Sequence, residues 1–305
     1  MATSDSVASA IAIVAACRLR ASFIARTTSG CGRPAEKPTI TVLSSTLPSL
    51  ASPSWLGDAT TWMSTACVHI TRASYRSFVE GTPGWLQGSA RRVVIPNGID
   101  VARVRGGAAA TDGAAVRREL GIPTDSLVIG NVARLQPAKG HRFLLGAFAR
   151  VLTDRPVSRL VVAGWGEDEA DLRRRAAELG IADRVLFLGK RQDVHRLLAA
   201  FDVFAFSSIH EGQGIAILEA MAAGVPVVAS AADGIPEMVR HDETGLLAPP
   251  RDEAALAAGI LRLAADADLR ARLTAGATRL LEAEYSVEAA ARRYDELYEQ
   301  LLAGD

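Results

Sequence analysis

The chain has 305 residues, 49% of them hydrophobic and 5% aromatic, which is enough for about two domains with sizeable cores. Its 34 basic side chains balance its 34 acidic ones, so net charge gives no argument for nucleic-acid binding, and any anion must be bound locally. The three cysteines, Cys17, Cys31 and Cys67, are odd in number and lack metal-ligand spacing, which indicates reduced thiols rather than a disulfide framework.

The amino-terminal segment lacks the pattern of a secretory signal. Asp5 is the only charged residue before Arg18, so no basic region precedes the apolar stretch 7–16, which predicts a core helix, with a transit peptide as the alternative. No run of about 18 apolar residues is free of proline and charge. The sequence therefore predicts a cytoplasmic protein with no transmembrane segment, for which peripheral membrane contact stays open.

The first hundred residues predict short elements bounded by turn residues. They are strands at 39–43, 67–70 and 92–95 and a helix at 73–79, followed by a turn at 96–98. Residues 101–113, VARVRGGAAATDG, show no periodicity and are interpreted as a linker between domains.

From residue 114 onward, apolar runs of strand length alternate with helix patterns. The strand-like runs are 127–133, 160–163, 185–188, 203–206 and 225–229. Between them, residues such as Leu172, Ala176 and Leu179 share a helical face. Continuous apolar strands that alternate with helices predict an α/β fold with a parallel, doubly wound sheet, whose ligands bind at the carboxyl ends of the strands.

The stretch 211–229, EGQGIAILEAMAAGVPVVA, has the most unusual chemistry of the chain. If a helix begins near Gly214, the residues three and four positions from Glu219 are all apolar. A helical glutamate on a solvated face would have charged neighbours there, so this carboxylate is expected to accept hydroxyl or amide protons from a ligand. Gly212 and Gly214 let the backbone approach a ligand closely at a helix start, which suits phosphate.

With other segments, this stretch resembles the retaining glycosyltransferases of family 4, within glycosyl transferases group 1. Glu211 and Glu219 match the family's two glutamates separated by seven residues. Further matches follow in the family's order: IPNGID at 95–100, RLQPAKG at 134–140, LVVAGWGE at 160–167, VLFLGKRQDV at 185–194, FDVFAFSSIHEG at 201–212 and GIPEMV at 234–239. The resemblance covers residues 91–303.

The resemblance implies the GT-B architecture, two Rossmann-like domains facing a cleft. Residues 1–103 would form an acceptor-side domain, joined by a helix at 287–303, and residues 104–286 the donor-binding domain. The first domain is expected to be incomplete, because IPNGID arrives as early as residue 95. Ser44 also stands where the family has a histidine near the reacting sugar.

The implied reaction is that of a hexosyltransferase, which moves a sugar from a UDP-sugar or GDP-sugar to an acceptor hydroxyl with retention of configuration. No metal or other cofactor is implied. The acceptor would be a sugar, a lipid or a small molecule. Arg134 and Lys139 would hold the diphosphate, Glu211 would orient a hydroxyl of the donor sugar, and Glu219 would accept the ribose hydroxyls. The remaining implied donor-binding residues are Gly212, Gln213, Gly214, Ile215, Arg191 and Gly164.

Two other functions are weighed against this one, and two further features are set aside. An inactive remnant that keeps only the donor site is favoured by the short first domain. A Rossmann oxidoreductase needs GxGxxG after a first strand and an acid about 20 residues further on, and neither occurs in that context. Asp266-Ala267-Asp268 matches the metal-binding DxD pattern but lies between two predicted helices, so helix capping is predicted instead. His210 is left out of the chemistry, because a single histidine is more often structural.

Overall fold

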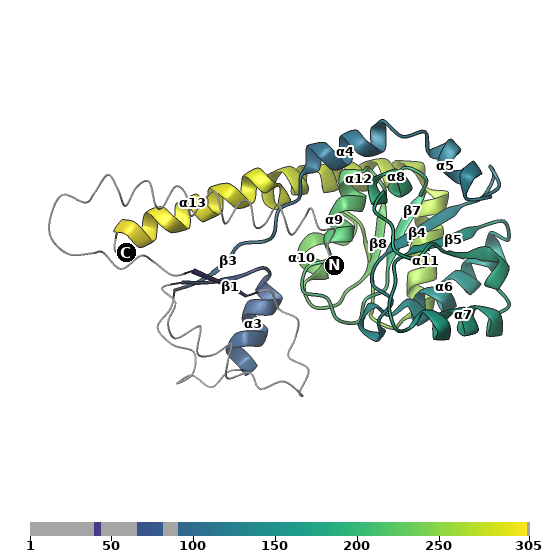
Figure 1. Cartoon of the computed structure of the whole chain (residues 1–305), viewed down its shortest axis with the longest axis horizontal. Coiled ribbons are helices and arrows are strands. Elements are labelled where there is room, and N and C mark those ends of the chain that lie inside the picture. Colours follow the sequence, from purple (N-terminus) through teal and green to yellow (C-terminus); the bar gives the residue numbers. More distant parts are fainter. Residues whose placement is uncertain (1–39, 44–65, 82–90, 304–305) are drawn as a thin grey trace. The chain divides into compact units, whose positions relative to one another are not determined.

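The computed structural model describes residues 40–43, 66–81 and 91–303 (Figure 1). The predicted helix at 7–16, Ser44, Cys17 and Cys31 lie outside these residues. The chain divides into two compact units, one of Asp100–Ala283 and one of Ala2–Ile99 with Glu284–Asp305.

The larger unit is built on a six-stranded parallel sheet. Its strands are β4 (Val128–Val132), β5 (Arg159–Ala163), β6 (Val185–Phe187), β7 (Val203–Phe206), β8 (Val227–Ser230) and β9 (Leu246–Ala248). They lie in the order β6-β5-β4-β7-β8-β9, every neighbouring pair parallel. This is a doubly wound order, and its direction reverses between β4 and β7. The predicted parallel, doubly wound sheet is confirmed, and β9 is an addition to it.

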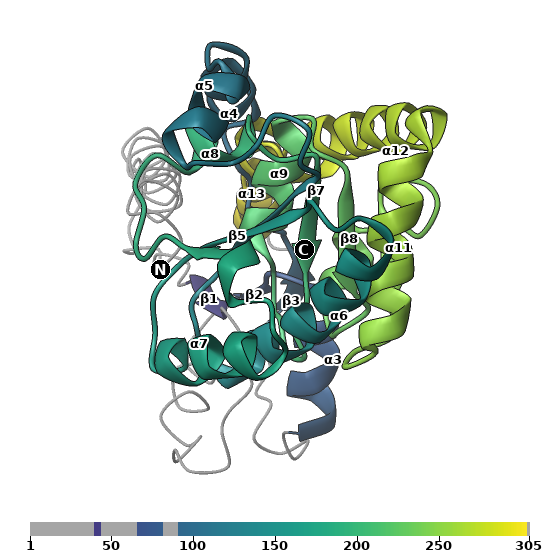
Figure 2. The ribbon, with the colours of Figure 1, turned by 90° about the vertical axis from the view of Figure 1, so that its right-hand side faces the viewer.

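Helices cover both faces of this sheet. They are α4 (Val101–Ala109), α5 (Gly113–Glu119), α6 (His141–Asp154), α7 (Glu169–Glu178), α8 (Val194–Leu198), α9 (Ile215–Ala222), α10 (Ile235–Met238), α11 (Glu253–Ala265) and α12 (Ala267–Leu280). A π-helical turn, Leu281–Tyr285, follows α12. Figure 2 shows α4, α8 and α9 on one side of the strands and α6 and α7 on the other.

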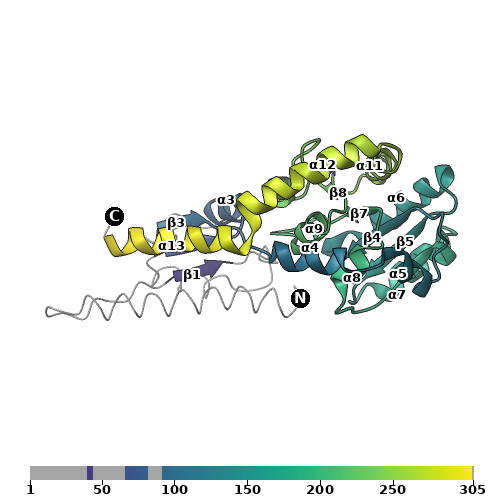
Figure 3. The same ribbon diagram turned by 90° about the horizontal axis from the view of Figure 1, so that it is seen from above.

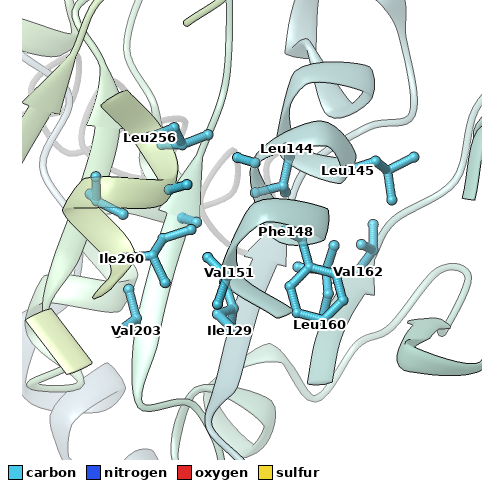
Figure 4. Close-up of a cluster of buried hydrophobic side chains, with 14 of the residues drawn as sticks. Ile129, Leu144, Leu145, Phe148, Val151, Leu160, Val162, Val203, Leu256 and Ile260 are labelled. Atoms are coloured by element: carbon cyan, nitrogen blue, oxygen red, sulfur yellow. The ribbon is translucent and has the colours of Figure 1, made fainter. Parts of the chain in front are cut away.

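The main core lies between the sheet and α6, α7 and α11. Phe148 and Leu144 of α6 are at most 1% exposed and pack with Ile129 of β4 and Leu160 of β5 (Figure 4). Ile260 of α11 belongs to the same cluster. Burying one such side chain contributes about 1.5–3 kcal/mol, so this apolar layer fixes α6 against the sheet. It thereby places the loop that precedes α6 at the carboxyl end of β4.

The predicted linker at 101–113 is wrong, because most of it is helical. Asp100 caps α4, its side chain accepting from the backbone amide of Arg103 at 2.8 Å. The buried residues of α4 are its first residue and those three and seven positions after it, on one helical face, but the alanines and glycines around them hide this pattern in the sequence. The buried residues of α4 are Val101, Val104 and Ala108. Helix α4 packs on α8 and α9, so this segment is part of the larger unit.

The smaller unit contains a three-stranded parallel sheet, with two helices. Its elements are β1 (Ile40–Leu43), β2 (Ala66–His69), α3 (Arg72–Gly81), β3 (Arg91–Val94) and α13 (Val287–Ala303). Figure 3 shows α13 running alongside β3. Leu297 of α13 packs with Val68 and Ile95. Ser286 caps α13 as predicted, since its hydroxyl accepts from the amide of Ala289 at 3.1 Å.

Two smaller findings concern a cysteine and the possibility of a membrane-spanning helix. The side chain of Cys67 is a buried thiol in β2. Within the described residues, no helix combines the length and the apolar character that crossing a membrane requires.

Candidate functional site

Lys139 and Glu211 form an ion pair where the sheet order reverses. Lys139 ends the loop after β4, and Glu211 lies in the loop between β7 and α9. Lys139 Nζ is 2.7 Å from Glu211 Oε2, and the two side chains are 22% and 10% exposed. The sequence predicted both residues for the site but not their pairing. A largely buried ion pair at this edge of a parallel sheet marks the place where such folds bind ligands.

Two hydrogen bonds to backbone carbonyls tie the two loops together. The amide of Ile209 donates to the carbonyl of Ala138 at 2.9 Å, and the hydroxyl of Ser207 donates to the carbonyl of Lys139 at 3.0 Å. Gly140 has φ +63°, and a Cβ there would lie 2.2 Å from the carbonyl oxygen of Ser207. Only glycine fits this close, left-handed turn, which therefore fixes the position of Lys139.

A chain of hydrogen bonds between buried polar side chains lies next to the same loops. The side-chain amide of Asn131 in β4 donates to the carbonyl of Ala205 in β7 at 2.8 Å. Its oxygen, Oδ1, lies 3.0 Å from His141 Nε2, so Nε2 carries the hydrogen and donates. Burial, and then the nearby charge of Lys139, lower the pKa of His141 to about 4. The neutral imidazole therefore joins α6 to the two central strands, a role the sequence did not reveal.

Glu211 is held from three sides. Asp233 Oδ2 accepts from the amide of Glu211 at 2.9 Å, and the amide of Gly234 donates to the carbonyl of Glu211 at 3.0 Å. The hydroxyl of Ser208 lies 3.5 Å from Glu211 Oε2. Asp233 has φ +42°, in the left-handed region that glycine favours. An aspartate there supplies a carboxylate that a glycine lacks. His210, 56% exposed, lies 3.4 Å from that carboxylate.

Helix α9 begins beside this pair. Its first residue is Ile215, and Gly214 at the N-cap position provides no side-chain cap. Gln213 is 8% exposed, whereas Gly212 is half-buried. The predicted helix start near Gly214 is therefore confirmed. The amides of Ile215 and Ile217 donate to the carbonyls of Gln213 and Gly214, at 3.1 and 2.9 Å. No side chain caps this helix start, which suits the binding of an anionic ligand.

Glu219 is the only charged residue of α9 and is 7% exposed. The predicted apolar helical face around it is confirmed. Its nearest basic side chain comes from another helix, since His195 Nε2 in α8 lies 3.8 Å from Glu219 Oε1. No pattern in the sequence indicated this contact across 24 residues of chain.

Arg134 and Arg191 have partners of their own. The guanidinium of Arg134 lies 5.6 Å from the ring centre of Trp165, and Lys190 Nζ is 5.1 Å from the same ring, both within cation–π range. Arg191 makes two hydrogen bonds to Asp193, at 2.8 and 2.7 Å. These bonds to Arg191 hold the pKa of Asp193 below its usual range. Among the residues that the structure describes, neither arginine forms a hydrogen bond or an ion pair with Lys139 or Glu211, so only part of the predicted site is brought together.

Gly164 has a packing role. A Cβ there would lie 1.8 Å from the carbonyl oxygen of Ala133, and its amide donates to the carbonyl of Gly189 at 2.9 Å. The glycine thus allows the ends of β4, β5 and β6 to approach one another.

A pocket of about 680 Å³ is lined in part by the loop that carries Lys139. Its lining includes Pro137, Gly140, Arg142, Asp168 and Arg251. Burial, with the charges of neighbouring acids, raises the pKa of Asp168. None of the sequence-predicted site residues lines this pocket.

The DxD sequence is a cap, as predicted. Asp266 Oδ1 accepts from the amide of Leu269 at 2.8 Å at the start of α12. Among the residues that the structure describes, no group of three or more His, Cys, Asp or Glu side chains is placed to hold a metal ion.

This fold and site define a class, and comparison with known proteins gives its family. Residues 113–280 match the family described as glycosyl transferases group 1. The match covers more than half of the chain, so the chain belongs to this family. The predicted resemblance to group 1 and the GT-B fold class are thereby confirmed, the latter by similarity to solved GT-B glycosyltransferases. Retention and membership of family 4 stay predictions.

Particular relatives are similar over part of their length. A D-inositol 3-phosphate glycosyltransferase of Stackebrandtia nassauensis is 41% identical over 177 residues, 54% of this chain and 40% of the relative. A GDP-mannose-dependent monoacylated alpha-(1-6)-phosphatidylinositol monomannoside mannosyltransferase of Corynebacterium glutamicum is 37% identical over 203 residues, 64% of this chain and 52% of the relative. The chain spans about half the length of these curated relatives.

The crystal structure of Anabaena HepE in complex with UDP is similar with a TM-score of 0.75 and 26% sequence identity. The similarity covers 87% of this chain and 72% of HepE. The same protein is also known in complex with UDP-glucose.

Proposed function

We propose that the chain binds a nucleoside diphosphate sugar and transfers the sugar to an acceptor hydroxyl, with retention of configuration and without a metal. The observation that carries this proposal is the Lys139–Glu211 ion pair, 2.7 Å long, beside the uncapped start of α9. A cation, a helix start without a side-chain cap and a carboxylate at one sheet edge provide for a diphosphate and for the hydroxyl groups of a sugar.

The diphosphate is assigned to Lys139 and to the first amides of α9, with Arg134 approaching from the Trp165 side. As the bond to the sugar breaks, negative charge grows on the leaving phosphate. A fixed ammonium group and a helix start stabilise that charge most when the site excludes water. In the proposal, the Lys139 ammonium group and the helix start take the place of a metal ion. Lys139, only 22% exposed, suits such a role.

The two glutamates are assigned to hydroxyl groups. Glu219 accepts the ribose hydroxyls, because it is a nearly buried carboxylate that makes no side-chain hydrogen bond among the described contacts of α9. Glu211 orients a hydroxyl of the donor sugar, and its hydrogen bonds with Asp233 and Gly234 fix its backbone for this. Both act by positioning the substrate. The incoming acceptor hydroxyl gives its proton to the leaving phosphate, so neither glutamate is a nucleophile.

The division of labour follows the two units. Residues 104–286 are proposed to bind the donor, and residues 1–103 with the helix at 287–303 to bind a sugar, lipid or small-molecule acceptor. The support is the complexes of HepE with UDP and with UDP-glucose, and the named donor of the mannosyltransferase relative, GDP-mannose. We propose a cytoplasmic location, where nucleotide sugars are available. Ser44 in place of the expected histidine favours one alternative, an inactive protein that binds the donor only.

The test is hydrolysis or transfer of UDP- and GDP-sugars by the whole chain in EDTA, with binding of the matching diphosphate measured in parallel. Glu211→Ala is expected to lower turnover about a hundredfold, because misplacing the reacting group costs roughly that much. Nucleotide binding should be kept, since Lys139 remains. Glu282→Ala, which removes an exposed carboxylate of the same unit, is the control. Unchanged turnover in Glu211→Ala contradicts the assignment, and binding without turnover in the wild type supports the inactive alternative.

A further inference from the structure

Three helices, α4, α8 and α9, meet around His195. His195 lies in the first turn of α8 and is 26% exposed at its side chain. A Cβ at Gly107 of α4 would lie 3.4 Å from His195 Cβ and 3.6 Å from Nδ1, which is van der Waals contact. The backbone of α4 therefore forms a wall against which the imidazole packs. The other edge of the ring, with Nε2, faces Glu219 at 3.8 Å.

The distance between His195 and Glu219 leaves the carboxylate available. At 3.8 Å the imidazole and the carboxylate are direct neighbours, and the separation exceeds that of a hydrogen bond. Glu219 keeps its acceptor lone pairs, and its side chain is 10% exposed, so a ligand can reach it. Within the described part of the chain, His195 is the only basic side chain within 4 Å of the Glu219 carboxylate. All other residues of α9 are apolar.

We propose that His195 is a positioning residue for the nucleotide site: it holds the Glu219 carboxylate in the orientation that accepts the ribose hydroxyls. The inference rests on the proposed function, because it needs Glu219 to contact the ribose. A glutamate side chain has three rotatable bonds, and without a partner it loses more freedom when it binds a ligand. His195, fixed between α4 and α9, orders the carboxylate before the nucleotide arrives. Helix α4 thus contributes to donor recognition through the imidazole that it supports.

The test compares UDP and GDP with their 2′,3′-dideoxy analogues in calorimetric titrations of the whole chain. The wild type should bind the parent nucleotide at least about tenfold more tightly than its dideoxy analogue, as expected for hydroxyls that bond to a carboxylate. His195→Ala should reduce this preference to about a third or less, mainly through weaker binding of the parent nucleotide. His195→Gln, whose amide nitrogen can take the place of Nε2, should restore it. His241→Ala, which removes an exposed histidine, should leave it unchanged.

Glu219→Gln supplies a second measurement. If His195 acts through the carboxylate, His195→Ala should change the preference no further in the Glu219→Gln background. An unchanged preference in His195→Ala alone, or an equal loss of affinity for both forms of the nucleotide, overturns the inference and leaves the proposed function standing. If the wild type binds none of the four nucleotides, the proposed function and the inference fall together.

Discussion

Acid should weaken the larger unit through His141. Its imidazole is 3% exposed and donates from Nε2 to Asn131, and its pKa is lowered from 6.5 to about 4. The unfolded chain therefore takes up a proton at a higher pH than the folded chain. Stability from the neutral imidazole is fully present above pH 6.5 and is lost as the pH falls from 6.5 toward 4.

The size of this effect follows from the two pKa values. At pH 5 the unfolded imidazole is almost fully protonated and the folded one hardly at all, which costs about 2 kcal/mol of unfolding free energy. At pH 4 the cost reaches about 3 kcal/mol and begins to level off. The loss is steepest, at about 1.4 kcal/mol per pH unit, in the range between the two pKa values.

The assay is urea unfolding of the wild type and of His141→Gln, followed by circular dichroism at pH 7.5 and pH 5. Glutamine can donate to Asn131 but does not titrate. From pH 7.5 to pH 5, the free energy of unfolding of the wild type should therefore fall by about 2 kcal/mol more than that of the variant. The pKa of His69, in the smaller unit, is also lowered to about 4, mainly by burial, but His69 is present in both proteins and its contribution cancels. Equal pH dependence in the two proteins would refute the reasoning.

Two further substitutions test the packing and the support of the site. Gly164→Ala should lower the free energy of unfolding by about 3 kcal/mol or more, because the new Cβ would lie 1.8 Å from the backbone oxygen of Ala133. Gly106→Ala, in an open position of α4, should raise the free energy of unfolding by about 0.5–1 kcal/mol in the same urea titration. Asp233→Gly should change stability by less than about 1 kcal/mol, since the loss of the hydrogen bond to the Glu211 amide is offset by relief of the left-handed backbone. Donor turnover should nevertheless fall severalfold in Asp233→Gly, and a turnover equal to that of the wild type would show that Glu211 does not need this support.

The sheet of the larger unit was predictable from the sequence, because its strands are buried on both faces and appear as unbroken apolar runs. The run at 203–206 matches β7 at both ends. Strand β8 begins at Val227, two residues later than predicted, because Pro226 cannot donate in the ladder. Strand β9 was missed, since three residues are too few for a pattern.

Helix α4 could not be recognised from composition. Its apolar stripe consists of two valines and an alanine in a segment rich in alanine and glycine, so the contrast between its faces is weak. Tertiary packing on α8 and α9 outweighs the poor helix propensity of two glycines.

The residue types of the site were predictable, but their partners were not. Lys139 and Glu211 are 72 residues apart in the chain, and only the sheet order brings them within 2.7 Å. The contact of Glu219 with His195 depends in the same way on how two helices pack. The sequence also did not predict that Asn131 and His141 support the site loops, because Asn131 lies in an ordinary strand pattern and His141 at an ordinary helix start.

The central claim is a binding site for a nucleoside diphosphate that depends on Lys139 and needs no metal. Calorimetric titration of the whole chain with UDP and GDP in EDTA tests it most directly, with Lys139→Ala as the variant and Arg262→Ala, which removes an exposed cation, as the control. Binding of one nucleotide by the wild type and the control, weakened at least about tenfold in Lys139→Ala, is the predicted result. Absence of binding to either nucleotide, binding only after a divalent cation is added, or equal affinity in Lys139→Ala would contradict the account.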